Sequence, residues 1–322
     1  MPRFIIQHIT RYTYPEPVRD SANQILLFPV KDQRQEVQSQ KLKISGDPFV
    51  EVFHDYYGNE SGSFTHIAPH HELRIESTIA VVTKSIEFPK DDQPAELQWQ
   101  QLTELKYTPP FIDFLKQEDF PSLGAVQEIA RPELYSGKTV YTAVSELNHF
   151  VYQQFRYIQG VTSVESTLEE VWQLKAGVCQ DFAHILLVML RLLGIPARYV
   201  SGYVCPHDHQ LRGEGATHAW VEAYLPFYGW LGLDPTNNCV VNDLHVRLAV
   251  GRSFADCSPV RGTYKGTARQ TLEVGVSVSH EDGVVNHEVA AVLTPQPRPV
   301  SETDHPEQNS YRQYIQMMQQ QQ

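Results

Sequence analysis

The chain is poor in several features that define whole classes of protein. It has four cysteines among 322 residues, too few and too scattered for a disulfide scaffold of this size, so we expect free thiols. No stretch approaches the ~20 consecutive apolar residues of a membrane span. The N-terminal segment also lacks the apolar run and small-residue cleavage site of a secretory signal. We therefore expect a cytoplasmic protein with no membrane contact.

Positive charge is scarce as well. Lysine and arginine total 26 against 38 acidic residues, which gives a formal net charge of −12. A chain without a basic run has no electrostatic basis for binding nucleic acid or an anionic membrane surface. Hydrophobic residues, at 41%, and aromatic residues, at 11%, are sufficient for a packed core. Because single domains cluster near ~100–150 residues, we expect two domains or one large one.

The first part of the chain alternates apolar and polar side chains in short runs separated by turn-forming residues. This pattern predicts an antiparallel, β-rich N-terminal domain over residues 1–88, built as a small sandwich or barrel. A polar, proline-bearing stretch follows, and we expect residues 89–135 to form a helical linker region. The segment 281–322 is rich in Pro, Gln and charge, which predicts a mostly disordered C-terminal tail.

Residues 136–280 combine helical and strand patterns in an order typical of an α+β fold. One helix is expected to start near Lys138, and a T-x-x-E capping box at Thr167 opens a second. The clearest helix runs over Cys179–Leu193, with a wide apolar face and a Gly-Ile-Pro terminator. Strand-like segments follow at 198–204, 217–224 and 230–233. We expect a core in which the helix that carries Cys179 packs on an antiparallel sheet.

Three residues in this core form a candidate catalytic set. Cys179 follows a glycine-bearing turn and opens a long helix, whose free N–H groups and positive dipole end favour a thiolate and a developing oxyanion. A thiolate needs a proton partner, and His218 in the Thr-His-Ala-Trp strand is the best candidate. Asp234 ends the next strand, where it can orient the imidazole. Each residue alone has an ordinary structural interpretation, but the ordered trio is a much rarer coincidence.

Neighbouring side chains supply weaker candidates. Gln180, in the first helical turn, and Trp220, two residues after His218, are candidate substrate-binding residues, although aromatic residues in strands usually fill cores. Asp181 would oppose a nearby thiolate, so we expect it in a structural salt bridge with a base such as Arg198. His184 points to another face of the helix, and we expect it to serve packing.

A short loop offers metal-ligand residues. Cys205, His207 and His209 lie close together in sequence, and His218 could complete a zinc site. The flanking residues are typical of a flexible exposed connection, however, and no CxxC pair is present. We therefore expect a mobile loop near the mouth of the active site, with no metal and no cofactor.

The segments around these residues closely resemble the transglutaminase-like superfamily, and more narrowly its bacterial cysteine proteinases. The segments that carry the resemblance are Gly177–His184, Gly194–Tyr203, His218-Ala219-Trp220 and Gly229–Asn237. Residues 3–83 resemble the β-rich region that often precedes this core, and the run from His245 to Gly262 is also similar to the family. The resemblance implies a papain-like core with Cys179 as nucleophile, His218 as general acid and base, and Asp234 holding the imidazole.

One departure from the family pattern bears on the reaction. Animal transglutaminases have Gly-Gln-Cys-Trp around the nucleophile, whereas this chain has Gly-Val-Cys-Gln at 177–180. An amine-accepting tunnel is therefore not expected. We predict a cysteine hydrolase that cleaves peptide or isopeptide amide bonds through a thioester, with a peptide or protein substrate. The alternatives are protein-glutamine acyl transfer to amines and a non-catalytic binding or assembly module. The sequence leaves the oligomeric state open.

Overall fold

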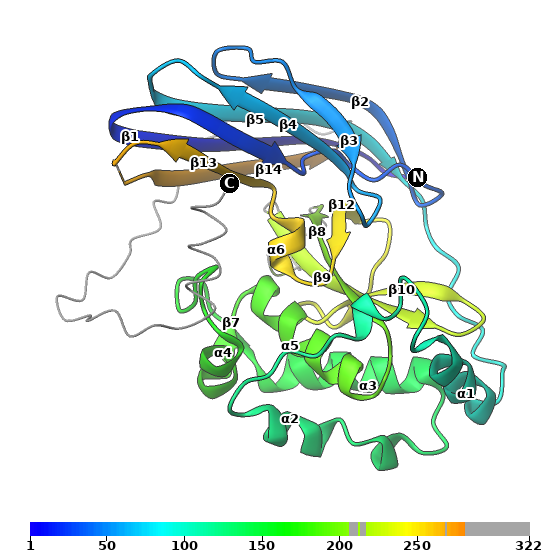
Figure 1. Cartoon of the computed structure of the whole chain (residues 1–322). Coiled ribbons are helices and arrows are strands. Elements are labelled where there is room, and N and C mark those ends of the chain that lie inside the picture. Colours follow the sequence, from blue (N-terminus) through cyan, green and yellow to red (C-terminus); the bar gives the residue numbers. More distant parts are fainter. Residues whose placement is uncertain (206–211, 213–216, 268, 281–322) are drawn as a thin grey trace. The chain divides into compact units, whose positions relative to one another are not determined.

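The computed structural model describes residues 1–205, 212, 217–267 and 269–280 (Figure 1). The chain divides into two compact units, each described by itself. The first, here called the β unit, contains Arg3–Pro29, Val37–Val81 and the chain from Ser258. The second, here called the mixed unit, contains Met1–Pro2, Val30–Glu36 and Val82–Cys257.

The β unit is a seven-stranded sheet organised around β1 (Arg3–Ile25). Its strand order is β2-β5-β1-β4-β3, and β13 and β14 also pair with β1. The other strands are β2 (Gln35–Ile44), β3 (Glu51–His54), β4 (Glu60–His66), β5 (His70–Thr83), β13 (Val260–Lys265) and β14 (Thr271–His280). The β-rich N-terminal region is thus confirmed.

The long strand β1 changes partners midway. Residues 4–13 pair with β14, whereas residues 21–25 pair with β4 on one side and β13 on the other. Between these stretches, Pro15 and Pro17 have no N–H to give to a ladder, and Asp20 has a φ of 50°. These residues interrupt the first ladder and allow the strand to turn into the second.

The structure divides the chain differently from our sequence prediction. We expected residues 136–280 to form one core, but β13 and β14 pair with β1 and belong to the β unit. The alternating pattern identifies a strand without identifying its partner, so the sequence placed the boundary wrongly. The expected linker 89–135 also belongs to the mixed unit, where Trp99 Nε1 donates to Lys138 O and Arg191 donates to Phe114 O. The expected tail, 281–322, lies outside the described residues.

The mixed unit contains a five-stranded antiparallel sheet with the order β11-β10-β9-β8-β12. Its strands are β8 (Ala197–Val204), β9 (Thr217–Leu225), β10 (Gly229–Asp234), β11 (Cys239–Val240) and β12 (His245–Gly251). A short parallel pair, β6 (Arg156–Tyr157) with β7 (Ala176–Gly177), precedes it. The helices are α1 (Ala95–Leu105), α2 (Leu123–Ile129), α3 (Val140–Gln154), α4 (Leu168–Leu174), α5 (Cys179–Leu192) and α6 (Phe254–Cys257), with 3₁₀ turns η1 (Asp113–Leu115) and η2 (Pro132–Tyr135).

The helix boundaries follow from local capping chemistry. The Thr139 side chain accepts a hydrogen bond from Thr142 N at the start of α3. Thr167 and Glu170 form the predicted capping box of α4. Helix α5 is followed by Gly194 with a φ of 75°. The predicted α+β arrangement, with the cysteine-bearing helix on an antiparallel sheet, is confirmed.

Helix α5 lies in the core of the mixed unit. It packs against β8 and β9 and beside α3 (Figure 1). Its apolar face is buried through Phe182, Ile185, Leu186 and Met189. This burial fixes the helix and therefore the position of Cys179 at its first turn. Within the described ranges, no helix is long and apolar enough to cross a membrane.

Candidate active site

Cys179 is the first residue of α5, and its side chain is partly exposed. The backbone N–H groups of Asp181 and Phe182 are both taken by Val178 O, at 3.0 and 3.1 Å. Among the residues that the structure describes, the N–H groups of Cys179 and Gln180 have no acceptor. Two free donors and the positive end of the helix dipole therefore lie beside the thiol.

Asp181 caps the N-terminus of α5. Its Oδ2 accepts a 2.7 Å hydrogen bond from Val178 N and another of 2.7 Å from Thr162 Oγ1. Burial raises the pKa of Asp181, and these two hydrogen bonds oppose the rise. The expected salt bridge with Arg198 is wrong, because Arg198 pairs with Glu222 at 2.6 Å. Asp181 is structural, as expected, but it acts as a helix cap.

His218 and Asp234 form a buried pair between β9 and β10. His218 Nε2 lies 2.8 Å from Asp234 Oδ2, and both side chains are fully buried. Asp234 Oδ1 accepts from Thr236 N at 2.9 Å and Asn237 N at 3.2 Å, which anchors the carboxylate in the turn after β10. Burial alone would raise the pKa of Asp234, but the imidazole of His218 outweighs it and holds that pKa far below its usual range.

The other ring nitrogen of His218, Nδ1, does not contact Asp234. It is buried and makes no hydrogen bond to any described residue. Burial alone would lower the pKa of His218, but the charges of Asp234 and Cys179, with the hydrogen bond to Asp234, raise it to about 10. An imidazolium at this position can stabilise a thiolate at Cys179 on one side and the Asp234 carboxylate on the other. The structure thus brings the three predicted residues together.

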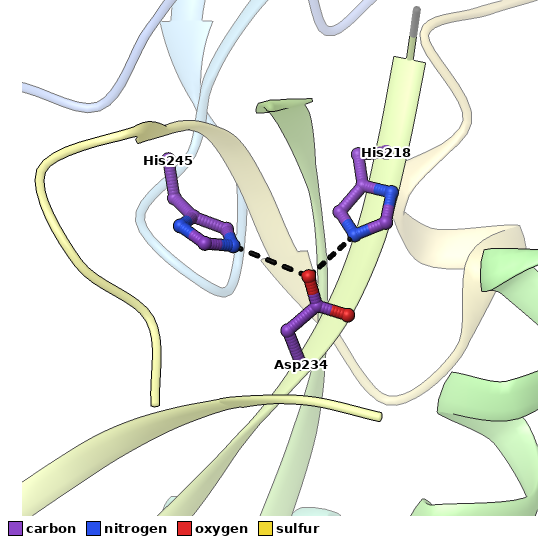
Figure 2. Close-up of side chains that lie close together, drawn as sticks. All are labelled: His218, Asp234 and His245. Atoms are coloured by element: carbon purple, nitrogen blue, oxygen red, sulfur yellow. Dashed lines mark hydrogen bonds and ion pairs between the residues drawn. The ribbon is translucent and has the colours of Figure 1, made fainter. Parts of the chain in front are cut away.

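A fourth residue at this site was not predicted from the sequence. His245, the first residue of β12, places its Nε2 3.3 Å from Asp234 Oδ2 (Figure 2). Asn237 Nδ2 donates to the same oxygen at 2.8 Å. The signal in the sequence was weak: a histidine at the start of an alternating run, eleven residues after Asp234. Only the order of the strands reveals that it reaches the carboxylate.

These side chains also form a set of possible metal ligands. One ligand atom each from His218, Asp234 and His245 lie within 4.8 Å of one another, all buried. Both histidine nitrogens already contact Asp234 Oδ2, so a metal ion would have to replace these hydrogen bonds. The set therefore fits a hydrogen-bonded catalytic cluster better than a metal site. Of the loop residues considered for zinc, Cys205 is buried, while His207 and His209 lie outside the described residues.

The structure places the weaker candidate residues in different surroundings. Trp220 is only 1% exposed, and its ring packs near His218 and His245, with centroids 6.2 and 5.3 Å apart. Its burial leaves no free surface for substrate, so the expected binding role is replaced by support of the two imidazoles. Gln180 is partly exposed next to the nucleophile. His184 is half-buried and accepts from Phe254 N at 3.1 Å, in agreement with a packing role.

Comparisons with known proteins identify the family and the fold of the chain. Residues 127–235 match the family model of the transglutaminase-like superfamily, and residues 4–82 match that of the bacterial transglutaminase-like N-terminal region. An uncharacterized protein of Mycobacterium leprae is 30% identical over 282 residues, covering 87% of this chain and 99% of the relative. An uncharacterized Mycobacterium bovis protein is 31% identical over 309 residues, covering 88% and 95%.

Two further proteins are similar to this chain. A protein-glutamine gamma-glutamyltransferase of Pseudomonas aeruginosa is 32% identical over 97 residues, which cover 28% of this chain and 14% of that protein. A crystal structure from Cytophaga hutchinsonii, described as that of a candidate cysteine protease, superposes with a TM-score of 0.68 at 23% identity. It covers 88% of this chain and 92% of that one, and it shows that the two share a fold.

Proposed function

The chain belongs to the transglutaminase-like superfamily, and from this premise we propose that it is a cysteine hydrolase that cleaves peptide or isopeptide amide bonds. One observation carries the proposal. The Asp234 carboxylate binds Nε2 of His218 at 2.8 Å, and Cys179 at the start of α5 acts electrostatically on the same imidazole. This arrangement supplies a nucleophile, a proton carrier and an orienting acceptor in one chain of contacts.

The proposed reaction has two steps. The Cys179 thiolate attacks the amide carbonyl, and the oxyanion that forms is held by the free N–H groups of Cys179 and Gln180. The C–N bond then breaks as His218 gives its proton to the departing amine, leaving a thioester on Cys179. In the second step, His218 takes a proton from water, the resulting hydroxide attacks the thioester, and the acid leaves as the thiolate is restored.

Acyl transfer to an amine is the second candidate. It is favoured by the similarity to the Pseudomonas aeruginosa glutamyltransferase over 97 residues. Both reactions share the first step and differ only in whether water or an amine resolves the thioester. We favour water because it requires no acceptor site, and because Gln180 stands where animal transglutaminases carry a tryptophan. The net charge of −12 favours neutral or basic substrates.

The test uses p-nitrophenyl acetate as a small acyl donor and glycinamide as the competing amine. Trapping in acid, followed by peptide mass spectrometry, locates the acetyl group, and chromatography separates acetate from N-acetylglycinamide. The other thiols are poor competitors. Cys205 and Cys257 are buried, and burial with the nearby Asp234 charge raises the pKa of Cys239 to about 12. Cys179→Ala and His218→Ala serve as matched inactive variants.

Three outcomes separate the candidates. Acetylation of Cys179 that depends on His218 and turns over to acetate supports hydrolysis. Enzyme-dependent accumulation of N-acetylglycinamide at the expense of acetate would replace hydrolysis by acyl transfer. If Cys179 is acetylated no faster in wild type than in His218→Ala, the triad is not operating. The non-catalytic binding or assembly role would then replace both enzymatic proposals.

A further inference from the structure

Asp234 Oδ2 contacts two imidazoles rather than one. Nε2 of His218 lies 2.8 Å from it and Nε2 of His245 lies 3.3 Å from it, one from each side (Figure 2). The three side chains expose 0 to 1% of their surface. An ionised carboxylate can only accept hydrogen bonds, so each of the two facing nitrogens carries a proton. The His218–Asp234 pair is therefore part of a His–Asp–His cluster that also contains His245.

The second imidazole is held firmly by its own surroundings. His245 Nδ1 lies 3.1 Å from Asn242 Oδ1 and 3.4 Å from Asn242 N. Asn242 Oδ1 also accepts from Leu244 N at 2.9 Å, which fixes the orientation of the amide. The ring packs edge-on against Trp220, with centroids 5.3 Å apart. His245 Nδ1 thus has an acceptor when it is protonated and a donor when it is not.

A glycine on β8 leaves room for the contact between His245 and Asp234. Gly202 on β8 lies opposite His218 on one side and Arg247 of β12 on the other. A Cβ atom at position 202 would lie 2.6 Å from the Trp220 ring and would collide with the backbone oxygen of Val246. Without a side chain here, the start of β12 and the Trp220 ring can both approach the catalytic histidine.

We infer that His245 is a positioning residue of the catalytic site. It acts through Asp234, because it holds the carboxylate in place and reduces the stabilisation that this carboxylate gives to the proton on His218. The inference rests on the proposed function, because it assumes that His218 serves Cys179. It assigns a role in the reaction to a residue whose hydrogen bonds go to Asp234 and Asn242.

The direction of the effect follows from the number of donors on one oxygen. His218 Nε2, Asn237 Nδ2 and His245 Nε2 all point at Asp234 Oδ2. Each donor stabilises the carboxylate charge and so reduces the stabilisation that this charge can give to the His218 imidazolium. Removal of the His245 donor leaves Asp234 anchored by Thr236 N and by Asn237. His218 should then hold its proton more tightly and return it to the reaction more slowly.

This direction does not depend on whether His245 is neutral or protonated. A neutral imidazole contributes a donated hydrogen bond, and an imidazolium adds a positive charge close to His218, so both oppose the proton on His218. The other titratable or charged groups coupled to this cluster from neighbouring elements remain in place when His245 is changed. They are Cys179 of α5, Tyr157 of β6 and Cys239 of β11, together with Arg212, whose backbone N–H donates to Asn237 Oδ1.

The test measures the pH dependence of Cys179 alkylation by iodoacetate in wild type, His245→Phe and His245→Gln. An anionic reagent reacts fastest when the thiolate lies beside an imidazolium. The rate should therefore fall at high pH, when His218 loses its proton. The pH of this fall is here called the alkaline limit. Brief pH jumps keep the protein folded at high pH. Phenylalanine preserves the ring against Trp220 but cannot donate, whereas the glutamine amide can donate to Asp234 without titrating.

We expect His245→Phe to raise the alkaline limit by about half a pH unit or more. We also expect it to lower kcat on p-nitrophenyl acetate about tenfold, with KM changed by less than about twofold. His245→Gln should restore most of both properties. The control is His184→Phe, which alters another hydrogen-bonded histidine of the mixed unit and should lower stability without moving the limit. If His245→Phe fails to fold, His245→Leu provides a smaller side chain that cannot donate.

The possible failures are distinguishable. If the wild-type profile does not change in His218→Ala, the triad is not operating, and both the proposed function and this inference are overturned. If the profile depends on His218 but the His245→Phe limit stays in place or falls, the inference alone is overturned. The same holds if His245→Gln behaves like His245→Phe, because the donated hydrogen bond would then have no special role.

Discussion

The carboxylate of Asp181 accepts a 2.7 Å hydrogen bond from the backbone N–H of Val178, the residue that precedes the nucleophile. A second hydrogen bond of 2.7 Å from Thr162 Oγ1 ties the same oxygen to the loop after β6. The start of α5 and therefore the direction of Cys179 depend on an acidic side chain two residues further along. A negative group near a thiolate is tolerated here because its Oδ2 is occupied by these donors.

Replacement of Asp181 should separate capping from charge. In Asp181→Asn the side-chain oxygen can still accept from Val178 N and Thr162, so we expect the free energy of unfolding to fall by less than about 1 kcal/mol. Asp181→Ala loses both hydrogen bonds and leaves a buried N–H without a partner, which should cost about 2 kcal/mol. Urea unfolding of the two variants measures the difference. If both variants lost the same free energy of unfolding, the charge of Asp181, and not its capping hydrogen bonds, would be what stabilises the fold.

Gly177 is required by the same cap. A Cβ atom at position 177 would collide with Asp181 Oδ2 and would lie 2.8 Å from Asp181 Cβ and Cγ. We expect Gly177→Ala to displace the carboxylate, to cost about 2 kcal/mol, and to slow the alkylation of Cys179. The matched control is Gly124→Ala in α2, where a Cβ would meet no atom within 4 Å. There, the gain in helix propensity should leave stability unchanged or slightly higher. Similar losses in the two variants would contradict this explanation.

The features that the sequence predicted correctly depend on residues close together in the chain. The capping box at Thr167 and Glu170 and the stop at Gly194 are decided within a few residues, and the structure has both. The places of Cys179, His218 and Asp234 in the fold could also be predicted, because a cysteine at a helix start and a histidine and an aspartate in successive strands each carry a local pattern. His218 and Asp234 needed only the hairpin between β9 and β10 to meet.

The features that the sequence missed depend on which strands become neighbours. The alternating runs that form β13 and β14 are equally compatible with either sheet, and they join β1 across more than 230 residues. His245 begins β12, which is separated from β10 by both β9 and β8 in the sheet order β10-β9-β8-β12. Its contact with Asp234 follows from the path of the chain between β11 and β12. Neither the hydrophobic periodicity of the sequence nor the spacing of its residues predicts that path.

Glu222, on β9, should make a large and pH-dependent contribution to stability. Its side chain is 2% exposed and pairs with Arg198 at 2.6 Å and Arg247 at 2.7 Å. Burial alone would raise the pKa of Glu222, but the surrounding arginines, Arg247 first, lower it to about 2. Glu222→Gln leaves two largely buried guanidinium groups short of negative charge, so we expect a loss of about 3–5 kcal/mol at neutral pH.

The pH dependence of this loss distinguishes an ion pair from packing. Because the folded-state pKa of Glu222 is lowered from 4.5 to about 2, its stabilisation is fully present above pH 4.5 and is lost as the pH falls toward 2. The difference between wild type and Glu222→Gln should therefore shrink over this range. The exposed pair Lys138–Glu146 is the control, and Glu146→Gln should cost less than about 1 kcal/mol. A Glu222→Gln difference that is constant from pH 7 to about 2 would contradict the ion-pair explanation.

Asp234→Asn should leave the site in place and stop it from working. The amide can present its N–H₂ group to Nε2 of His218, which then has to be an acceptor, so the proton moves to Nδ1, the other ring nitrogen. We expect kcat/KM on p-nitrophenyl acetate to fall by about 10³–10⁴. Since Asp234 helps to raise the pKa of His218 from 6.5 to about 10, the stability that this pair provides is full below pH 6.5 and is lost as the pH rises through about 10. The unfolding free energies of wild type and variant should thus differ most just below pH 6.5 and converge as the pH rises toward 10. A gap that widens over this range would mean that Asp234 does not hold His218 in its charged form.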